Sequence, residues 1–120
     1  MEYMLLIHDD EQAWARLAGE ERSEIVSEYF AVSEEMRESG VWRAGAPLQA
    51  TSTASSVRLR EGEPLITDGP FAETQEQLGG YFLIDVDSDE AAAGWAAKLP
   101  AARYGTVEMR RLLAMEAPAG

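Results

Sequence analysis

The apolar residues of the chain recur in two ways, as short runs and at helical spacing, and the order of these patterns predicts the fold class. Residues 3–7 form a continuous apolar run, which is typical of a strand buried on both faces or nearly so. Residues 81–86 form a second strong run, and residues 41–45 and 106–113 have the patterns of two further strands. We therefore expect four strands, with residues 81–86 in the centre of a sheet.

Apolar residues at three- and four-residue spacing predict the helices. The longest such segment is residues 21–39, where one side would face the core and Gly40 would end the helix. A shorter helix before it would be capped by Asp10 and ended by Gly19, since glycine adopts the left-handed conformation at little cost. Serine and acidic residues at 87–90 provide a third helix start, and the alanine-rich helix that follows would continue until Pro100.

Two further features lie between the strands expected at residues 41–45 and 81–86. Residues 56–60 alternate with a period of two, residues 61–64 supply a turn and residues 65–67 return, so a hairpin with one solvated face is expected. Residues 68–81 begin with Asp-Gly-Pro-Phe and contain three carboxylates and a glycine pair. We expect Asp68 to cap a short helix with Pro70 in its first turn, and Gly79 and Gly80 to end that helix.

The order of these elements identifies a common arrangement. Without the hairpin it is strand, helix, strand, strand, helix, strand, which is the ferredoxin-like split βαβ order. The predicted fold class is therefore α+β, ferredoxin-like with an inserted β-hairpin, in a single domain of residues 1–120 whose residues 114–120 form a loose tail. Helices on one face of an open sheet leave the other face to be covered, and a second copy of the chain is an economical cover. We expect a homodimer.

Composition narrows the function classes. The chain has 22 acidic and 10 basic residues and a formal net charge of −12, which argues against nucleic-acid binding because phosphate contacts need clustered Lys and Arg. It has no cysteine and one histidine, so we expect no cofactor and no metal. The first apolar run is far shorter than the roughly 20 residues of a membrane span, and nothing before it resembles a signal peptide. We expect a cytoplasmic protein without membrane contact.

Asp68 and His8 are the candidate catalytic residues. Asp68 would lie between a strand and a helix start, where it either only caps the helix or also orients a ligand in a cavity. Histidine is the side chain whose ordinary pKa lies closest to neutrality, and His8 is expected at the end of the first strand, where side chains line pockets. If His8 reaches Asp68 or Glu73, the pair would be a general base with its orienting carboxylate. The alternative is a partly exposed histidine beside a neighbouring aspartate.

The candidate binding residues surround a pocket expected between the end of the first strand and residues 68–81. Glu73 and Glu76 would share one face of the short helix. They could bind a divalent ion through their oxygens together with Asp68 or, more commonly, be exposed partners of the helix dipole. Tyr81 would close the segment at the start of the central strand. Arg43 and Arg110 lie on strands and are the candidates for holding an anionic group, although either can be a surface charge.

The stretch at residues 68–81 resembles the signature of the DGPF branch of the YCII-related family, whose members have a ferredoxin-like α+β fold and mostly unassigned biochemical roles. The similarity extends over nearly the whole chain and includes residues 3–7, 62–80, 81–85, 95–97 with Pro100, and 107–110. It implies a dimeric α+β barrel, because members of similar fold commonly pair in this way. Lysine is common in the branch where this chain has Gln75, so a cationic role at that position does not carry over.

The wider YCII-related group is similar in having a proposed His–Asp pair, with the histidine on the first long helix and the aspartate just before a proline after the last helix. Neither residue carries over to this chain. Glu28 or Tyr29 stands near the place of the histidine, and Leu99 precedes Pro100. The lyase-like chemistry known in the wider group is therefore only an analogy for this protein.

Two functions from different classes are consistent with these features. The first is a cofactor-free enzyme or binder that takes a small organic molecule, expected to be anionic, in a pocket near Asp68. The second is a non-catalytic interaction or regulatory module, since relatives that resemble this chain are often encoded beside extracytoplasmic-function sigma factors, which implies a sigma factor as a possible partner. Whether the protein is an enzyme stays open.

Overall fold

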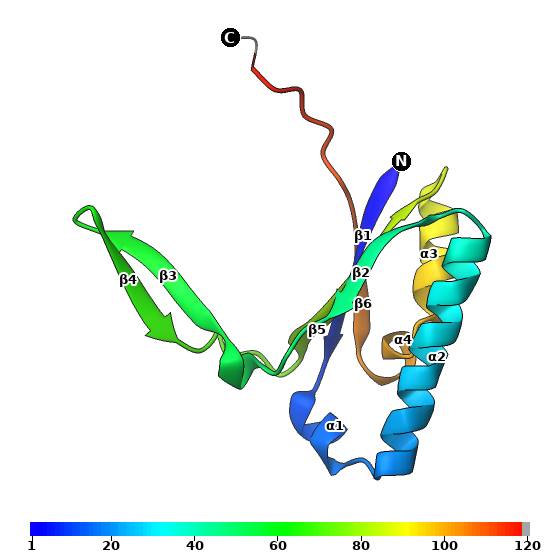
Figure 1. The fold of residues 1–120 in the computed structure, drawn as a ribbon, viewed down its shortest axis with the longest axis horizontal. Coiled ribbons are helices and arrows are strands. Elements are labelled where there is room, and N and C mark those ends of the chain that lie inside the picture. The colour runs from blue at the N-terminus through cyan, green and yellow to red at the C-terminus, as the bar shows by residue number, and fades with distance from the viewer. Residues whose placement is uncertain (119–120) are drawn as a thin grey trace.

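A four-stranded antiparallel sheet with helices against one face forms the body of the molecule, and a separate two-stranded hairpin extends from it (Figure 1). The structure is a computed structural model that describes residues 1–118. Its strands are β1 Glu2–Asp9, β2 Trp42–Pro47, β3 Ser55–Arg60, β4 Glu63–Asp68, β5 Gln77–Asp85 and β6 Thr106–Arg111. Its helices are α1 Glu11–Arg16, α2 Gly19–Glu38, α3 Asp89–Lys98 and α4 Ala101–Tyr104, with a 3-10 turn at Thr51–Thr53. The architecture is α+β, as the sequence predicted.

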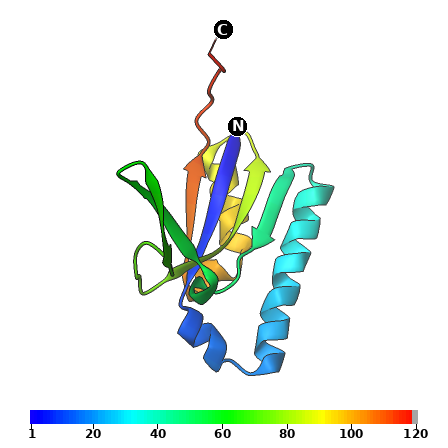
Figure 2. The same ribbon diagram turned by 60° about the vertical axis from the view of Figure 1, so that its left-hand side comes forward.

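The strand order in the sheet is β2-β5-β1-β6, and Figure 2 shows these strands side by side with α3 behind them. The expected central position of residues 81–86 is confirmed, because β5 lies between β1 and β2. The hairpin of β3 and β4 is inserted between β2 and β5 in the chain and forms a sheet of its own. Within residues 1–118, no helix is long and apolar enough to cross a membrane.

The core lies between the sheet and the helices α2 and α3. Alternate residues of β1 face it, so Tyr3, Leu5 and Ile7 are buried while Met4 and Leu6 lie on the other face. Further buried side chains complete this cluster: Val32, Met36, Phe82, Ile84, Val86, Ala92, Ala96, Leu99 and Ala101. Burial of these apolar groups is the main source of stability in a domain of this size.

The helix starts agree better with the sequence prediction than the helix ends do. Asp10 caps α1 by accepting hydrogen bonds from the amides of Gln12 and Ala13, and Gly40 follows α2 with a φ of +76°. The prediction that Gly19 ends the first short helix is wrong, because Gly19 is the first residue of α2. Pro100 does end the alanine-rich helix, but it also precedes the short helix α4, which the sequence did not predict.

The predicted helix after Asp68 is absent, since residues 69–76 form bends and irregular segments and β5 begins at Gln77. Gly79 and Gly80 therefore lie inside a strand and do not end a helix. Gly80 allows close packing of β5 on β2, because a Cβ at this position would lie 3.0 Å from the carbonyl oxygen of Ala46. Gly79 lies at the irregularity between β1 and β5, where the pairing shifts after Ile7.

The predicted hairpin is confirmed, but both of its faces are solvated within one chain. Glu61 and Gly62 make its turn, each with a positive φ, as a two-residue type I′ turn requires. Figure 1 shows the hairpin projecting away from the side of the sheet opposite α2 and α3. Of the predicted tail, residues 114–118 are exposed and have no helix or strand, and the rest lies outside the described residues.

Candidate functional site

Three charged or ionisable side chains come together on the face of the sheet that the helices leave open. The Nε2 atom of His8 lies 3.1 Å from Oε1 of Glu108, and Nε of Arg110 donates to Oε2 of Glu108 at 2.7 Å. The strand register explains this arrangement, since His8 pairs with Thr106, Leu6 with Glu108 and Met4 with Arg110. Residues that pair directly across antiparallel strands point to the same face. The sequence-predicted residues His8 and Arg110 are thus brought together through Glu108.

Glu108 stays ionised in this arrangement. Two hydrogen bonds hold the pKa of the Glu108 carboxyl below its usual range. The larger effect comes from Arg110 and the smaller one from His8. Glu108 therefore serves as an acceptor that orients the imidazole of His8. Glu108 was not among the site residues predicted from the sequence. The available signal was its position between Val107 and Met109, which places it on the opposite face from these two apolar residues.

The open face around this group is mostly apolar. Tyr81 of β5 pairs with Leu6 of β1 and with Ala46 of β2, so its half-buried ring belongs to the same face. Met4 and Leu83, which pair with each other, extend this surface along the sheet. Tyr81 is therefore placed two strands from β6, on the face that carries His8 and Glu108.

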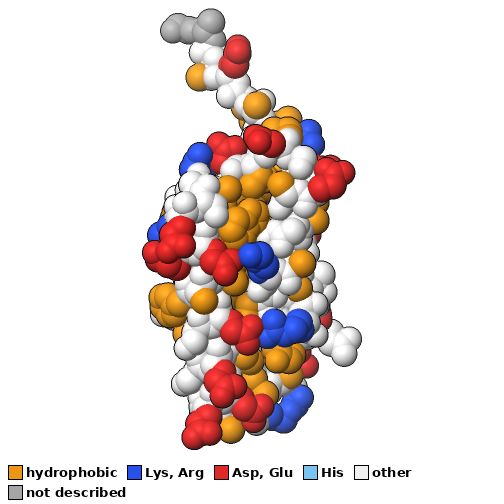
Figure 3. All heavy atoms as spheres, turned by 90° about the vertical axis from the view of Figure 1, so that its right-hand side faces the viewer, with side chains coloured by type: hydrophobic (Ala, Val, Ile, Leu, Met, Phe, Trp, Pro, Cys, Tyr) orange, Lys and Arg blue, Asp and Glu red, His pale blue; other side chains and the backbone are white. Residues whose placement is uncertain are grey.

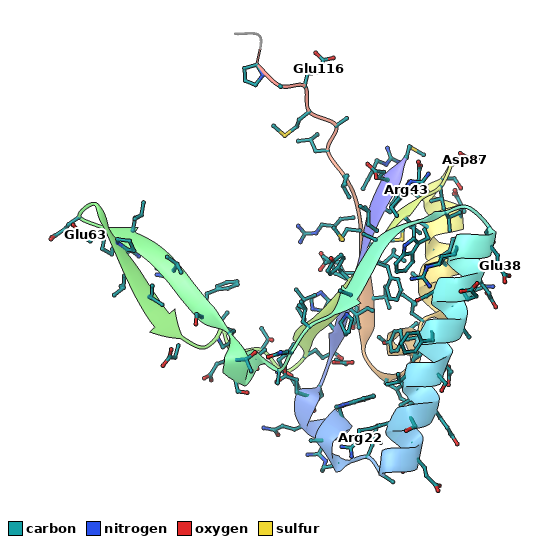
Figure 4. The ribbon with its side chains drawn as sticks, in the orientation of Figure 1. Arg22, Glu38, Arg43, Glu63, Asp87 and Glu116 are labelled. Carbon is teal, nitrogen blue, oxygen red and sulfur yellow. The ribbon has the colours of Figure 1, made fainter. Side chains whose placement is uncertain are left out.

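Arg43 lies at the other end of the sheet. Its guanidinium donates to Asp85 at 3.1 Å and to backbone carbonyls at Gly40 and Trp42, and Figure 4 shows it near the start of β1. Asp85 also binds the amino terminus at 2.8 Å, and this hydrogen bond, ahead of the contribution of Arg43, holds the pKa of the Asp85 carboxyl below its usual range. The structure does not bring Arg43 to the other predicted site residues.

The three carboxylates at residues 68–76 are separated from one another. Asp68 is the last residue of β4, opposite Ser55, and is exposed. Because no helix follows, the prediction that Asp68 caps one is wrong, and no hydrogen bond or ion pair within residues 1–118 joins it to His8. Glu73 is exposed in the connection to β5, whereas Glu76 accepts a hydrogen bond from the hydroxyl of Thr106 at 2.9 Å. Of the three, Glu76 alone lies beside the strand end that carries His8.

A cavity of about 260 Å³ lies between α1, α2 and α4. Asp9, the residue after His8, lines it together with the residues Asp10, Ala13, Trp14, Leu17, Glu21, Glu24, Ile25, Glu28, Tyr29, Pro100, Ala101 and Tyr104. Figure 3 shows the helix-covered side of the molecule, where acidic side chains gather at the lower end. The pocket predicted from the sequence was to begin at the end of the first strand, and this cavity does so, but residues 68–81 do not line it.

Two groups of the cavity have shifted pKa values. Burial raises the pKa of Tyr29 to about 12, and its hydroxyl accepts a hydrogen bond from the amide of Ala101 at 3.2 Å. Burial, followed by repulsion from Glu11, Glu76 and Asp10, raises the pKa of the Asp9 carboxyl. Glu28 and Tyr29, which stand near the place of the histidine in the proposed His–Asp pair of the wider group, line this cavity, whereas Leu99, at the place of the aspartate, is buried and does not line it.

No group of three His, Asp or Glu side chains within residues 1–118 is arranged to hold a metal ion. Glu73 and Glu76 with Asp68, the set considered from the sequence, do not converge, because Asp68 is on the hairpin and Glu76 is bound to Thr106.

Comparison with known proteins identifies the family. A model of the YCII-related domain matches residues 1–116. The chain is also 36% identical over 114 residues to an uncharacterized protein of Rhizobium meliloti (strain 1021), an alignment that covers 93% of this chain and 92% of that protein. Together with the α+β fold, these matches show that the chain belongs to the YCII-related domain family.

Proposed function

We propose that the protein binds a small organic anion on the open face of its sheet, beside His8, and that His8 can exchange a proton there without a cofactor. The observation that carries this proposal is the series Arg110, Glu108 and His8, whose contacts of 2.7 Å and 3.1 Å hold a guanidinium and an imidazole on one face. Glu108 takes the role that the sequence suggested for Asp68 or Glu73, because it is the carboxylate that orients the imidazole.

The chemistry of the group fits an anionic ligand with an apolar part. Arg110 contacts Glu108 through Nε, so its terminal nitrogens can form a charge-assisted pair with a ligand carboxylate. Leu6, Tyr81 and Leu83 provide apolar surface beside it. An imidazole held by a carboxylate can accept or donate a proton near neutral pH, which is the requirement for lyase-like acid–base chemistry.

The same proposal includes a second copy of the chain over the open face. The strand order β2-β5-β1-β6 supports a ferredoxin-like fold of the DGPF type with an inserted hairpin, and two such sheets packed face to face would form a dimeric α+β barrel. Its interior would enclose His8 and exclude water. Asp68 and Glu73 belong to the proposed site only if the second copy brings its own hairpin over the sheet.

Ligand binding at His8 can be tested by NMR with benzoate, phenylacetate and succinate as probes. We expect shifts of the His8 ring signals and of the Leu6 and Tyr81 amides, with affinity reduced about tenfold or more in Arg110→Gln because a charge-assisted hydrogen bond is lost. Arg60→Gln, at the exposed hairpin turn, removes the same charge and is the control. Probe binding that is unchanged in Arg110→Gln, or that leaves His8 unaffected with all three probes, contradicts the proposal.

A second candidate is the interaction module, and two exposed apolar residues favour it, one in the DGPF motif and one just before it. Phe71 is 84% exposed and Ile66 is 66% exposed, whereas large apolar side chains are usually buried or mark an interface. The family resemblance suggests an extracytoplasmic-function sigma factor as the partner to test. Co-purification of such a factor that is lost in Phe71→Ser and kept in Arg110→Gln would favour this candidate over the small-molecule binder.

A further inference from the structure

The cavity between α1, α2 and α4 has a chemical character different from that of the open sheet face. Its deeper wall is apolar and aromatic, with Trp14 and Tyr29 half-buried and Leu17, Ile25 and Pro100 between them. The ring of Tyr29 is fixed in place, since it stacks on Phe82 with centroids 6.3 Å apart and its hydroxyl is bound to the Ala101 amide. Concave sites with aromatic walls and a few polar groups are typical places for small ligands.

All charged residues that line the cavity are acidic. They are Asp9, Asp10, Glu21, Glu24 and Glu28. Asp10 caps α1 and Glu28 is paired with Arg103, but within residues 1–118 no hydrogen bond or ion pair engages the carboxylates of the other three. The arginines nearby do not line the cavity, and Figure 4 shows one of them, Arg22, near the α1 end of α2.

The rim of the cavity already holds a cation that belongs to the chain. The guanidinium of Arg103 lies 2.7 Å from Glu28 and 5.2 Å from the ring centroid of Tyr104, so one carboxylate and one aromatic ring contact it together. This is the combination by which proteins recognise organic cations, through charge and the negative face of a ring. The same two kinds of group, Glu24 or Asp9 and the ring of Trp14, are present in the cavity beyond the rim.

We propose that this cavity binds a small organic ammonium ion with an apolar chain or ring, seated against Trp14 and Tyr29, paired with Glu24 and attracted by the charges of Asp9 and Glu21. The ammonium group is attracted to the faces of the aromatic rings, and the apolar part of the ligand packs against Leu17 and Ile25. The site is distinct from the anion site proposed at His8, so either can fail without the other. An anion is disfavoured here by the surrounding carboxylates.

Three probes of equal chain length separate charge from shape: n-pentylammonium, 1-pentanol and pentanoate. We expect n-pentylammonium to bind most tightly, with pentanol weaker and pentanoate weakest, as followed by NMR shifts of the Trp14 indole signal, assigned from its loss in Trp14→Phe. Binding of n-pentylammonium should weaken as sodium chloride is raised, whereas that of pentanol should not. Equal affinity for all three probes, or tighter binding of pentanoate, overturns the proposal.

Matched variants of α2 test the role of the carboxylates. Glu24→Gln should weaken n-pentylammonium binding about fivefold to tenfold, because an ion pair is lost. Glu38→Gln removes the same charge at the far end of α2, at the position labelled in Figure 4, and should change the affinity less than twofold. Both positions are exposed, so folding should be retained in each. Equal affinities of the two variants would show that only net charge attracts the ammonium, and would overturn the assignment of the cavity.

Discussion

His8 and Asp9 are neighbours in β1, yet their side chains belong to different sites. His8 is bound to Glu108 on the open face of the sheet, whereas Asp9 lines the cavity between α1, α2 and α4. The alternation of a strand explains the separation, because consecutive side chains point to opposite faces. The sequence predicted His8 at a strand end correctly, but it could not identify Glu108 as the partner, since the contact joins residues 100 positions apart and depends on the register of β1 with β6.

At the residue scale, Asp9→Asn is expected to increase the free energy of unfolding at neutral pH. Burial raises the folded-state pKa of Asp9, so its ionisation costs more in the folded protein than in the unfolded chain. Ionisation of Asp9 therefore lowers the free energy of unfolding. This loss begins as the pH rises above the ordinary aspartate pKa of about 3.9 and is complete once the pH has passed the raised folded-state pKa. The stability gain of Asp9→Asn should be near zero at the acidic end of this window and should increase toward pH 7.

Urea unfolding at a series of pH values would measure this difference. Asp87→Asn, at an exposed position, removes the same charge and is the control. A gain that is the same in both variants, or one that decreases with pH, would contradict the assignment of the effect to burial of Asp9.

At the scale of elements, the role of a glycine or of a short segment depended on the strands that it packs against. The glycine pair at residues 79–80 was interpreted as a helix stop, and it lies inside β5 because the residues around it pair with β1 and β2. Helix α4 was missed because four residues give too little periodicity to detect. Its packing is nevertheless tight, since a Cβ on Gly105, the residue after α4, would lie 2.2 Å from the carbonyl oxygen of His8.

Two glycine substitutions test this packing against intrinsic helix preference. Gly105→Ala is expected to destabilise the protein by about 2 kcal/mol or more, because the backbone of β1 must move to admit the methyl group. Gly94→Ala lies inside α3, where a Cβ meets nothing within 4 Å, and should stabilise the protein by about 0.5–1 kcal/mol. Thermal or urea unfolding measures both. A neutral effect of Gly105→Ala would show that α4 does not pack closely on β1.

The whole molecule leaves two surfaces uncovered within one chain, the open face of the sheet and the apolar side of the hairpin. Val57 pairs with Ile66 and Leu59 with Pro64, which places these four on one side of the hairpin, and the first three are 63–67% exposed. A lone hairpin with a bare apolar side is marginally stable in water. The hairpin itself projects from the side of the sheet that lies away from α2 and α3 (Figure 1), which is consistent with the proposed second copy.

At this scale, Ile66→Ser is expected to weaken the proposed dimer about tenfold or more, because an aliphatic side chain would lose burial against the second copy. Leu65→Ser is the matched control, since Leu65 is the preceding residue, points to the opposite side and is 49% exposed. Sedimentation velocity over a range of protein concentrations gives the dissociation constants. A protein that is monomeric at all concentrations, or an equal effect of the two variants, would contradict the proposed role of the hairpin's apolar side.

The sequence by itself determined the features that depend on local periodicity and capping: the α+β class, the long helix, the cap at Asp10, the hairpin and the central strand. These signals are contained within a few neighbouring residues, so they can be detected without knowledge of the fold. The tertiary structure alone decided which residues meet. Strand register joined His8 to Glu108, helix packing formed the acidic aromatic cavity, and pairing with β1 and β2 made a strand of residues 77–80. Such contacts join positions far apart in the chain, and their energies depend on burial and geometry that only the folded molecule defines.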